Sequence, residues 1–141
     1  MKFICYDIGN KRVGVAVSHP FMSMALPKDT YWRKNFSKDI AFLVDLAKKE
    51  GATTIVCGLP VNFDGSPSDQ TAITQSFIDE LKKASPIPIV TADERFSTKE
   101  ATRVLISGGV RREDRKNHVD SIAASYILED YIRKLKLKGD I

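Results

Sequence analysis

Asp7 interrupts an apolar stretch of this sequence at a position where a carboxylate could do chemistry. The stretch FICYDIGNKRVGVAV, residues 3–17, has the composition of buried strands, yet its first apolar run ends on Asp7. A carboxylate at the edge of an apolar core costs several kcal/mol when nothing compensates it. We therefore expect a compensating group beside Asp7, and this group need not belong to the protein.

Two further carboxylates stand at comparable positions. Glu94, next to Asp93, follows the apolar run IPIVTA, and Asp120 lies in the stretch HVDSIAASYILEDYI. In a helix, position 120 shares one face with positions 124, 127 and 131, so Asp120 points toward the core. Each acid alone could simply complement a helix N-terminus, which is worth ~0.3–1 kcal/mol. That explanation is less convincing for the three acids together, because all three could lie in one site.

Asp7, Glu94 and Asp120 form a donor set that favours a hard cation. Carboxylates without matching histidines suit Mg²⁺ or Mn²⁺, which prefer oxygen ligands, and disfavour zinc. Two such ions ~3.5–4 Å apart can clamp the attacking and leaving oxygens of a phosphoryl displacement. The three acids are therefore candidate metal ligands and catalytic residues, and they favour hydrolysis of phosphodiester bonds. We expect Cys5 and Cys57, each within an apolar run, to be buried rather than paired or metal-bound.

The order of the predicted elements indicates how these acids could meet. Two β-branched runs joined by a Gly-Asn-Lys turn predict an antiparallel hairpin over residues 3–18, and a third short strand near 23–26 could extend it. Periodicity then predicts a helix that stops at Gly51, a strand over 53–60, a helix over 71–84 and a strand over 87–93. Ser97 and Glu100 form a predicted capping box for a helix ending at 108–109, and the last helix is expected from about Val119 to Leu137.

This order predicts an α/β fold with a mixed five-stranded sheet, three antiparallel strands followed by two parallel ones, and helices on both faces. Ligands of such sheets gather at the carboxyl ends of the parallel strands. If the strands that carry Asp7 and Glu94 are adjacent, their carboxylates meet at one edge. The 141 residues fit one domain, over 1–141.

Positive charge is concentrated in the C-terminal third of the chain. Residues 1–94 carry 11 basic and 11 acidic side chains, whereas residues 95–141 carry 11 basic and 7 acidic ones. Much of the excess lies in GGVRREDRKNH, residues 108–118, where two glycines and a lack of apolar periodicity predict an exposed loop. The plain interpretation is a solvated loop. The functional one is a mobile basic segment that binds nucleic acid.

The composition favours a soluble protein. It is 43% hydrophobic and 28% charged, and no apolar run approaches the ~18 residues of a membrane span. The N-terminus lacks the uninterrupted apolar core of a signal peptide, because a charged residue stands at position 7. We therefore expect no membrane association and a cytoplasmic location.

Four motifs, in order along nearly the whole chain, resemble those of the YqgF/RuvX family. They read DIGNKRVGVAVS, GLPVNFDGS, DERFST and HVDSIAASYIL. The family consists of RNase H-like proteins described as Holliday junction resolvases or pre-16S rRNA nucleases. The resemblance implies an RNase H-like fold and a Mg²⁺-dependent acidic site, and it matches Asp7, Glu94 and Asp120 to the acids of the first, third and fourth motifs. Of the two acids in DERFST we favour Glu94 over Asp93.

Three features depart from the family pattern. His19 stands where an acid is common, Phe96 stands where leucine is common, and the segment PSDQTA is less glycine-rich than usual. The first two do not touch the three acids. The last one bears on how the substrate is contacted.

Basic and polar residues near the acids are candidates for binding substrate. Lys11 and Arg12 could hold a phosphate that flanks the scissile one, and Arg95 could steady developing charge. Residues of the loop after the strand over 53–60 could shape the rim of the site. Each also has a plain interpretation as a surface residue or a structural ion pair. The full set is Lys11, Arg12, Asn62, Asp64, Ser66, Arg95, Arg111, Arg112, Arg115 and Lys116.

The sequence thus predicts a metal-dependent endonuclease. We expect it to process the 5′ end of pre-16S rRNA, acting as a monomer on structured precursor RNA. One alternative is a Holliday junction resolvase, which would need a two-fold dimer to make paired cuts in a DNA junction. Another is a nucleic-acid-binding module without catalysis. A third, an ATPase of the actin and sugar-kinase type, needs two such domains, and 141 residues provide one.

Overall fold

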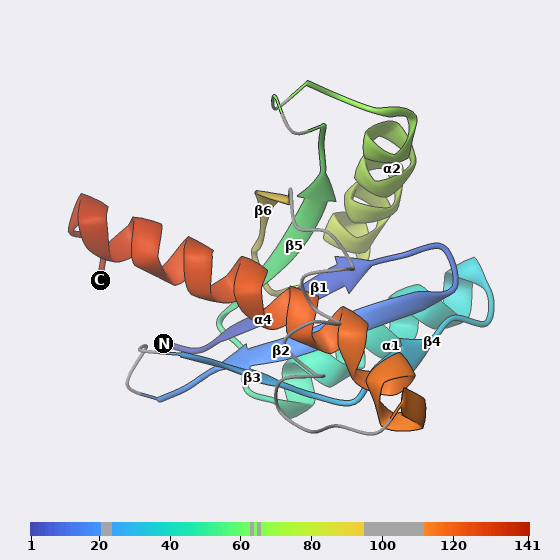
Figure 1. The fold of residues 1–141 in the computed structure, drawn as a ribbon, viewed down its shortest axis with the longest axis horizontal. Coiled ribbons are helices and arrows are strands. Elements are labelled where there is room, and N and C mark those ends of the chain that lie inside the picture. The colour runs from blue at the N-terminus through green and yellow to red at the C-terminus, as the bar shows by residue number, and fades with distance from the viewer. Residues whose placement is uncertain (21–23, 63, 65, 95–111) are drawn as a thin grey trace.

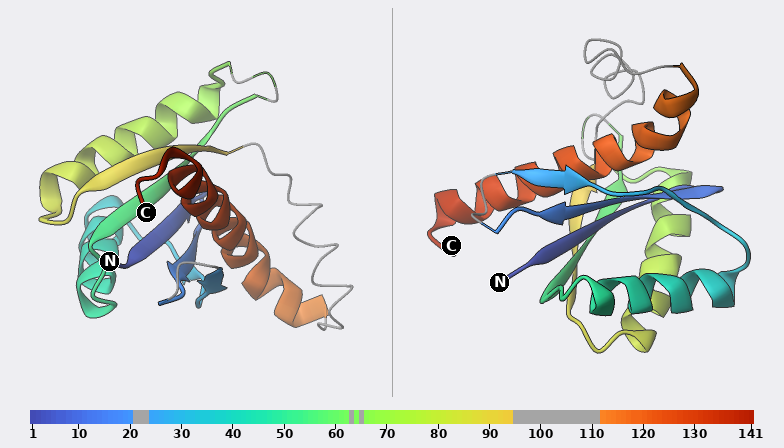
Figure 2. Two further views of the ribbon diagram at one scale, coloured as in Figure 1. Left: turned by 90° about the vertical axis from the view of Figure 1, so that its left-hand side faces the viewer. Right: turned by 90° about the horizontal axis from the view of Figure 1, so that it is seen from below.

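The computed structural model describes residues 1–20, 24–62, 64, 66–94 and 112–141, and for residues 94 and 112–120 it describes the backbone. Within this part of the chain a sheet lies between helices (Figure 1). Helices α1 (Phe36–Lys49) and α2 (Asp69–Ala84) cover one face, and α4 (Arg112–Lys138) crosses the other (Figure 2). No described helix is both long enough and apolar enough to span a membrane.

Six strands make up the described sheet, in the order β3-β2-β1-β5-β6, with β4 paired to β2 beside β3. The pairs β1–β2, β2–β3 and β2–β4 are antiparallel, and the pairs β1–β5 and β5–β6 are parallel. The strands are β1 (Phe3–Ile8), β2 (Arg12–Ser18), β3 (Ala25–Pro27), β4 (Tyr31–Trp32), β5 (Thr54–Pro60) and β6 (Ile89–Glu94).

The predicted α/β fold with a mixed sheet is confirmed, and the structure corrects two details. The two-residue strand β4 makes a sixth strand that the sequence did not predict, because so short a strand has no measurable periodicity. The strands that carry Asp7 and Glu94 are not adjacent, since β5 lies between β1 and β6. Each right-handed crossover adds its strand one place further out, which separates them by one strand.

Strand alternation divides the core into two layers. Ile4, Tyr6 and Ile8 of β1 pack with α1 and α2, in a cluster that includes Leu43 and Phe77. The alternate residues Phe3 and Cys5 pack with α4, in a second cluster that includes Ala124, Ile127 and Leu128. Because side chains alternate along a strand, odd positions of β1 belong to the α4 face of the sheet.

The ends of α1 follow the sequence signals. Asn35 is the N-cap, and its side chain accepts a hydrogen bond of 2.9 Å from the backbone N–H of Lys38. Gly51, with φ of 71°, directly follows the C-cap Glu50, so the predicted stop is confirmed. Helix α2 begins with a capping box between Ser68 and Thr71.

Helix α4 begins earlier than the sequence predicted. The expected exposed loop over 108–118 is wrong from Arg112 onward, because the backbone is helical from there, about two turns before Val119. The first turns of α4 could not be predicted from apolar periodicity, because their sequence has none. Arg, Glu and Lys have high helix propensity and can extend a helix beyond its packed part. The predicted helix that starts at Ser97 lies outside the described residues.

Candidate active site

Asp7 is placed by β1 near the carboxyl end of a parallel strand, on the α4 face. It follows Phe3 and Cys5 on the same side of the strand, and its side chain is half-buried. Its partner across the antiparallel pair is Gly14. Gly58 follows Cys57, the partner of Tyr6, and therefore stands beside Asp7 on the other side.

These two glycines leave space around the Asp7 carboxylate. Side chains directly opposite each other on paired strands have Cβ atoms ~4.5–5.5 Å apart, and glycine has none. Both glycines are buried strand residues. The described glycines with positive φ are Gly51 and Gly139, so the backbone does not require glycine at 14 or 58. Chain conformation therefore does not explain why glycine stands on both sides of Asp7.

Glu94 is the last residue of β6 and pairs with Pro60 of β5. Two strand spacings, about 10 Å, separate β6 from β1. Val90 and Ala92 of β6 pack against the α4 cluster, whereas Ile89 packs against the other layer. Position 94 falls in the first series by alternation, and Asp93, which is exposed, falls in the second.

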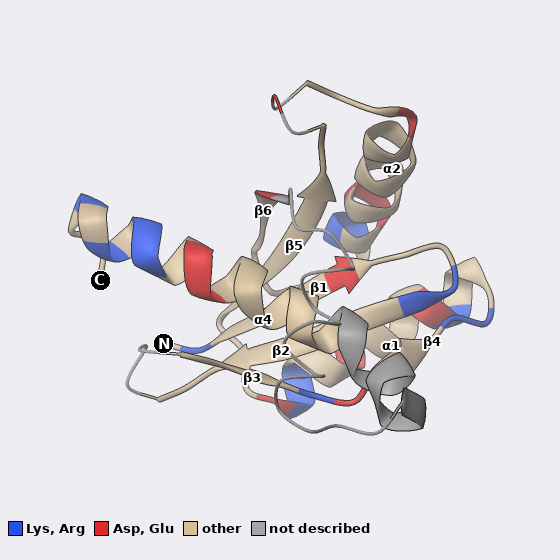
Figure 3. Ribbon diagram, in the orientation of Figure 1, with Lys and Arg blue, Asp and Glu red and all other residues tan. Residues whose placement is uncertain are grey.

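The backbone of α4 brings Asp120 to the same end of the sheet. Ser121, the next residue, is fully buried, and its hydroxyl accepts a hydrogen bond of 3.3 Å from the backbone N–H of Val15. Val15 neighbours Gly14, which faces Asp7 across the β1–β2 pair. The backbone of α4 at Asp120 therefore lies over the strand positions beside Asp7. The acidic ends of β1 and β6 are drawn in red in Figure 3.

The turn after β1 is tightly constrained. The Gly9 N–H donates to the Arg12 carbonyl at 2.8 Å, and a Cβ on Gly9 would come within 2.9 Å of that oxygen. Lys11 is exposed at the tip of the turn. The half-buried Arg12 pairs with Trp32 of β4, and its guanidinium lies 5.2 Å from the centre of the Trp32 ring.

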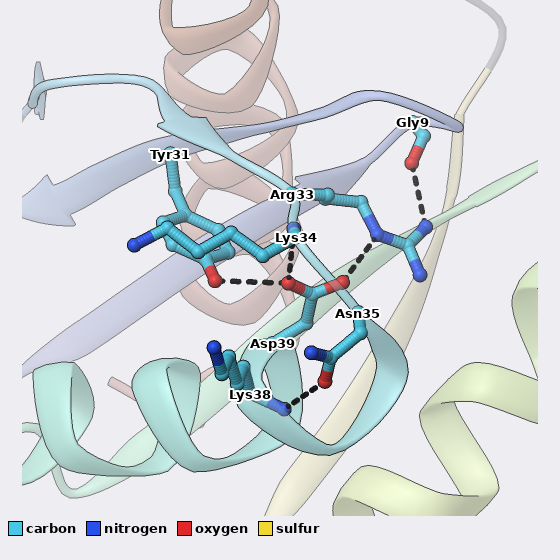
Figure 4. Close-up of polar contacts among 7 residues, drawn as sticks. All are labelled: Gly9, Tyr31, Arg33, Lys34, Asn35, Lys38 and Asp39. Atoms are coloured by element: carbon cyan, nitrogen blue, oxygen red, sulfur yellow. Dashed lines mark hydrogen bonds and ion pairs between the residues drawn. The ribbon is translucent and has the colours of Figure 1, made fainter.

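A polar network that the sequence did not predict stabilises this turn (Figure 4). Arg33 donates through Nη1 to the Gly9 carbonyl at 2.8 Å and through Nε to the Asp39 carboxylate at 2.9 Å. Asp39 also accepts from the Tyr31 hydroxyl at 2.8 Å and from the Lys34 N–H at 2.9 Å. An acid within an apolar helix pattern, six residues after an arginine, is the only trace of this network in the sequence.

The network sets the ionisation of Asp39. Burial by itself would raise the pKa of this carboxyl, since the residue is 1% exposed. Hydrogen bonds from the Lys34 backbone, from Arg33 and from Tyr31 outweigh burial and lower the pKa below its ordinary value. Asp39 is thus a charged structural residue that fixes the Gly9 turn through Arg33.

Hydrogen bonds among its own residues stabilise the loop after β5, which the sequence predicts to form the rim of the candidate site. The Asp64 carboxylate accepts from the Ser66 backbone N–H at 2.9 Å and from the Ser66 hydroxyl at 2.6 Å. The Asn62 N–H donates to the Ser66 carbonyl at 2.9 Å, and the Asn62 side-chain amide donates to the Ser66 hydroxyl at 3.0 Å. Asn62 and Asp64 are exposed and follow the end of the parallel strand β5.

The basic candidates divide into two groups. Arg95 and Arg111 lie outside the described residues. Arg112, Arg115 and Lys116 fall in the first turns of α4 rather than in a loop. A further run of basic residues occupies the other end of that helix, at Arg133, Lys134, Lys136 and Lys138 (Figure 3).

The described cysteines take no part in a metal site. Cys5 and Cys57 are buried, as the sequence predicted, and burial raises the pKa of the Cys57 thiol to about 12. Among the side chains that the structure describes, no three histidine, cysteine or acidic residues cluster to hold a metal ion. Since the side chains of Glu94 and Asp120 are not among them, the three-carboxylate set stays a prediction. Its oxygen donors fit Mg²⁺ or Mn²⁺.

Solved structures share this fold. *T. thermophilus* RuvC in complex with Holliday junction substrate matches with a TM-score of 0.60 and 12% identity over 96% of each chain. The Fowlpox virus resolvase in complex with Holliday junction DNA matches with a TM-score of 0.56 and 15% identity over 96% of this chain and 99% of that one. At 12% and 15% identity, these likenesses show a shared fold.

Sequence comparison defines the family. The model described as "RuvX: Holliday junction resolvase" matches residues 1–134. A protein named "Putative pre-16S rRNA nuclease" from Rickettsia rickettsii is 38% identical over 133 residues, 94% of this chain and 86% of that protein. One of the same name from Clostridium acetobutylicum is 38% identical over 135 residues, 96% of this chain and its own full length. The chain belongs to the RuvX family and is a nuclease by that membership.

Proposed function

We propose that this chain is a divalent-metal-dependent endonuclease whose site consists of Asp7, Glu94 and Asp120. The observation that carries the proposal is the hydrogen bond between Ser121 and Val15, which brings the backbone at Asp120 over the strands beside Asp7. The alternation of β6 supports Glu94 rather than Asp93 as the third acid. Residues 1–141 would form one nuclease domain, working in the cytoplasm.

The surroundings of Asp7 suit a hydrated cation. Gly14 and Gly58 leave room on both sides of its carboxylate, and the acids offer oxygen donors to Mg²⁺ or Mn²⁺. When bound, such an ion would polarise a phosphoryl oxygen and offset negative charge. The protein's own contribution is to hold the carboxylates on rigid strands and on the packed helix α4.

The neighbouring residues would orient the nucleic acid. Lys11 and Arg12, in and after the turn that contains Gly9, would contact a phosphate next to the scissile one. Arg95 follows Glu94 directly in sequence and would neutralise charge at the same edge. Asn62 and Asp64, which are exposed at the rim, are suited to contact sugar hydroxyls, which distinguish RNA from DNA.

The proposed substrate is structured precursor of 16S rRNA, cut near its 5′ end. The names of the relatives from Rickettsia and Clostridium favour it. A Holliday junction in DNA is the second candidate, favoured by the description of the family model and by the junction complexes of RuvC and the Fowlpox virus resolvase. A nucleic-acid-binding module without catalysis is the remaining alternative.

The test is cleavage mapping with purified protein on precursor RNA, linear DNA and a four-way junction, with Mg²⁺, Mn²⁺ or EDTA. We expect metal-dependent cuts in the precursor that Asp7→Asn abolishes. Because removing one of several close carboxylates relieves repulsion, the variant should keep the thermal stability of the metal-free wild type. Asp79→Asn, which removes an exposed acid from α2, is the control and should cleave normally. Unchanged metal-dependent cleavage by Asp7→Asn would refute the site.

A further inference from the structure

Trp32 is an exposed aromatic residue at the sheet edge next to the candidate site. It is the only tryptophan of the chain, and 51% of its surface is exposed. Trp32 pairs with Arg12, whose guanidinium lies 5.2 Å from the ring centre. This cation–π contact holds the ring in place while leaving it accessible to solvent.

A cavity of about 530 Å³ opens beside Trp32. Its aromatic lining consists of Trp32, Tyr31 and Phe42, and the last two rings stack with centroids 4.0 Å apart at an interplanar angle of 9°. Phe42 is 41% exposed. Lys34 and Lys38 add two cations to the lining, and Asp29 adds one anion. The lining is therefore aromatic with a net positive charge.

One residue that lines the cavity contacts the helix that carries Asp120. This residue, Thr30, lies 3.1 Å from the Ser121 hydroxyl, and Ser121 directly follows Asp120. Tyr31 packs with the α1 layer, so Trp32 and its partner Arg12 fall on the α4 face by alternation, as Asp7 does. Two strand spacings, about 10 Å, separate β4 from β1.

We propose that Trp32, with Lys34 and Lys38, binds a single-stranded segment of nucleic acid next to the cleavage site, by stacking a base on the indole and neutralising adjacent phosphates. The proposal rests on the nuclease function proposed above and adds how its substrate is held. Exposed aromatic rings among cations are the recurrent means of binding single strands without sequence preference. The bases of a paired duplex are already stacked, so this surface favours an unpaired segment.

Intrinsic fluorescence provides a direct test, because the signal comes from Trp32 alone. Oligoadenylate titrated into the wild-type protein in EDTA should quench this fluorescence, and a duplex of the same length should quench it less. Binding of labelled oligoadenylate, followed by anisotropy, should weaken about 5- to 150-fold in Trp32→Ala. Trp32→Phe, which keeps a stacking ring, should restore most of the affinity. Thermal melting of each variant reports whether the fold persists.

Two double variants that remove the same charge test whether Lys34 and Lys38 contact the oligonucleotide. Lys34→Ala/Lys38→Ala should lower the salt dependence of oligonucleotide binding, with a slope smaller by ~1.4 in log affinity against log salt. Lys48→Ala/Lys49→Ala removes the same charge from the opposite end of α1 and should leave the slope unchanged. In cleavage assays, Trp32→Ala should raise KM and leave kcat near the wild-type value.

The EDTA binding assay separates this inference from the nuclease function. Oligonucleotide binding that depends on Trp32 supports the inference even if no substrate is cleaved. Wild-type affinity in a folded Trp32→Ala variant, or equal quenching by single strand and duplex, would overturn the inference and leave the proposed site intact. An equal change of slope in the Lys48/Lys49 variant would overturn the assignment of the two lysines.

Discussion

At the scale of single residues, strand alternation separates two neighbouring acids. Asp93 is exposed and belongs to the series of Ile89, which packs on the α1 and α2 side, whereas position 94 continues the series of Val90 and Ala92. The motif DERFST contains both acids, and their positions in the sequence do not show which of them belongs to the site. The register of β6 provides the physical reason to prefer Glu94.

We therefore predict that Glu94→Gln loses cleavage and Asp93→Asn does not. Loss of a residue that only supports a metal ligand typically costs ~10–100-fold, and loss of a ligand should exceed this. We expect Glu94→Gln to fall more than ~100-fold in kcat/KM, with Asp93→Asn within a few-fold of the wild type. Side-by-side single-turnover cleavage measures both. The reverse order would assign the site to Asp93.

A second residue-scale prediction concerns the space beside Asp7. Gly58 does not have a positive φ, so Gly58→Ala should be tolerated by the backbone and could even stabilise the strand by ~0.5–1 kcal/mol. The added methyl group would occupy room next to the carboxylate. We expect an unchanged or higher melting temperature with a higher Mg²⁺ concentration for half-maximal cleavage. An unchanged Mg²⁺ requirement would show that the glycine serves packing instead.

At the scale of elements, the sequence predicted what local signals encode. The β1–β2 hairpin, the stop of α1 at Gly51 and the strand–helix–strand unit β5–α2–β6 are confirmed, because each has a turn residue or an apolar period of its own. Strand β4 and the first turns of α4 were missed. The former depends on pairing with β2, and the latter on helix propensity rather than on an apolar period. The Arg33–Asp39 network was missed because it joins a loop to a helix.

That network makes an element-scale prediction about pH. The pKa of Asp39 is lowered in the folded state, so its contribution to stability is complete above its unfolded pKa of ~3.9 and is lost as the pH falls through the folded value. Asp39→Asn should lower the free energy of unfolding at pH 7 by about 1–3 kcal/mol.

The deficit of Asp39→Asn should begin to shrink below about pH 4, where the carboxyl of the unfolded wild-type chain takes up a proton, and should vanish only below the lowered folded pKa. Denaturant unfolding from pH 3 to 7 measures this. Asp45→Asn, which removes an exposed acid from the same helix, is the matched control and should change stability little at any pH. A deficit that is constant with pH would mean that shape rather than charge makes Asp39 important.

The early start of α4 alters the prediction for its basic residues. Arg112 and Lys116 are one helical turn apart, so they share a face of the helix rather than a loop. If they contact phosphates, replacing both by Ala should reduce the slope of log affinity against log salt by ~1.4–1.8. Lys134→Ala/Lys138→Ala has the same spacing and charge change at the other end of α4. An equal slope change in both variants would indicate a diffuse charge effect.

At the scale of the whole molecule, the open question is whether one site or two act on the substrate. The proposed site is a single edge of the sheet, at which Asp7, Glu94 and Asp120 would meet. One such edge suffices for a cut in a single strand of RNA. Symmetric resolution of a four-way junction needs two sites related by a two-fold axis, hence a dimer.

The C-terminal end of α4 bears on this choice. Arg133, Lys134, Lys136 and Lys138 give it a strong positive charge, and Leu137, 79% exposed, is its most exposed apolar residue. Two copies joined there would bring like charges together, which opposes association. We therefore predict a monomer that cuts precursor RNA in preference to junction DNA. Sedimentation at the enzyme concentration of the cleavage assays measures the first, and competition between the two labelled substrates measures the second. A stable dimer that makes paired, symmetric nicks in the junction and leaves the RNA intact would reverse the choice, and would direct attention to a two-fold interface outside the basic end of α4.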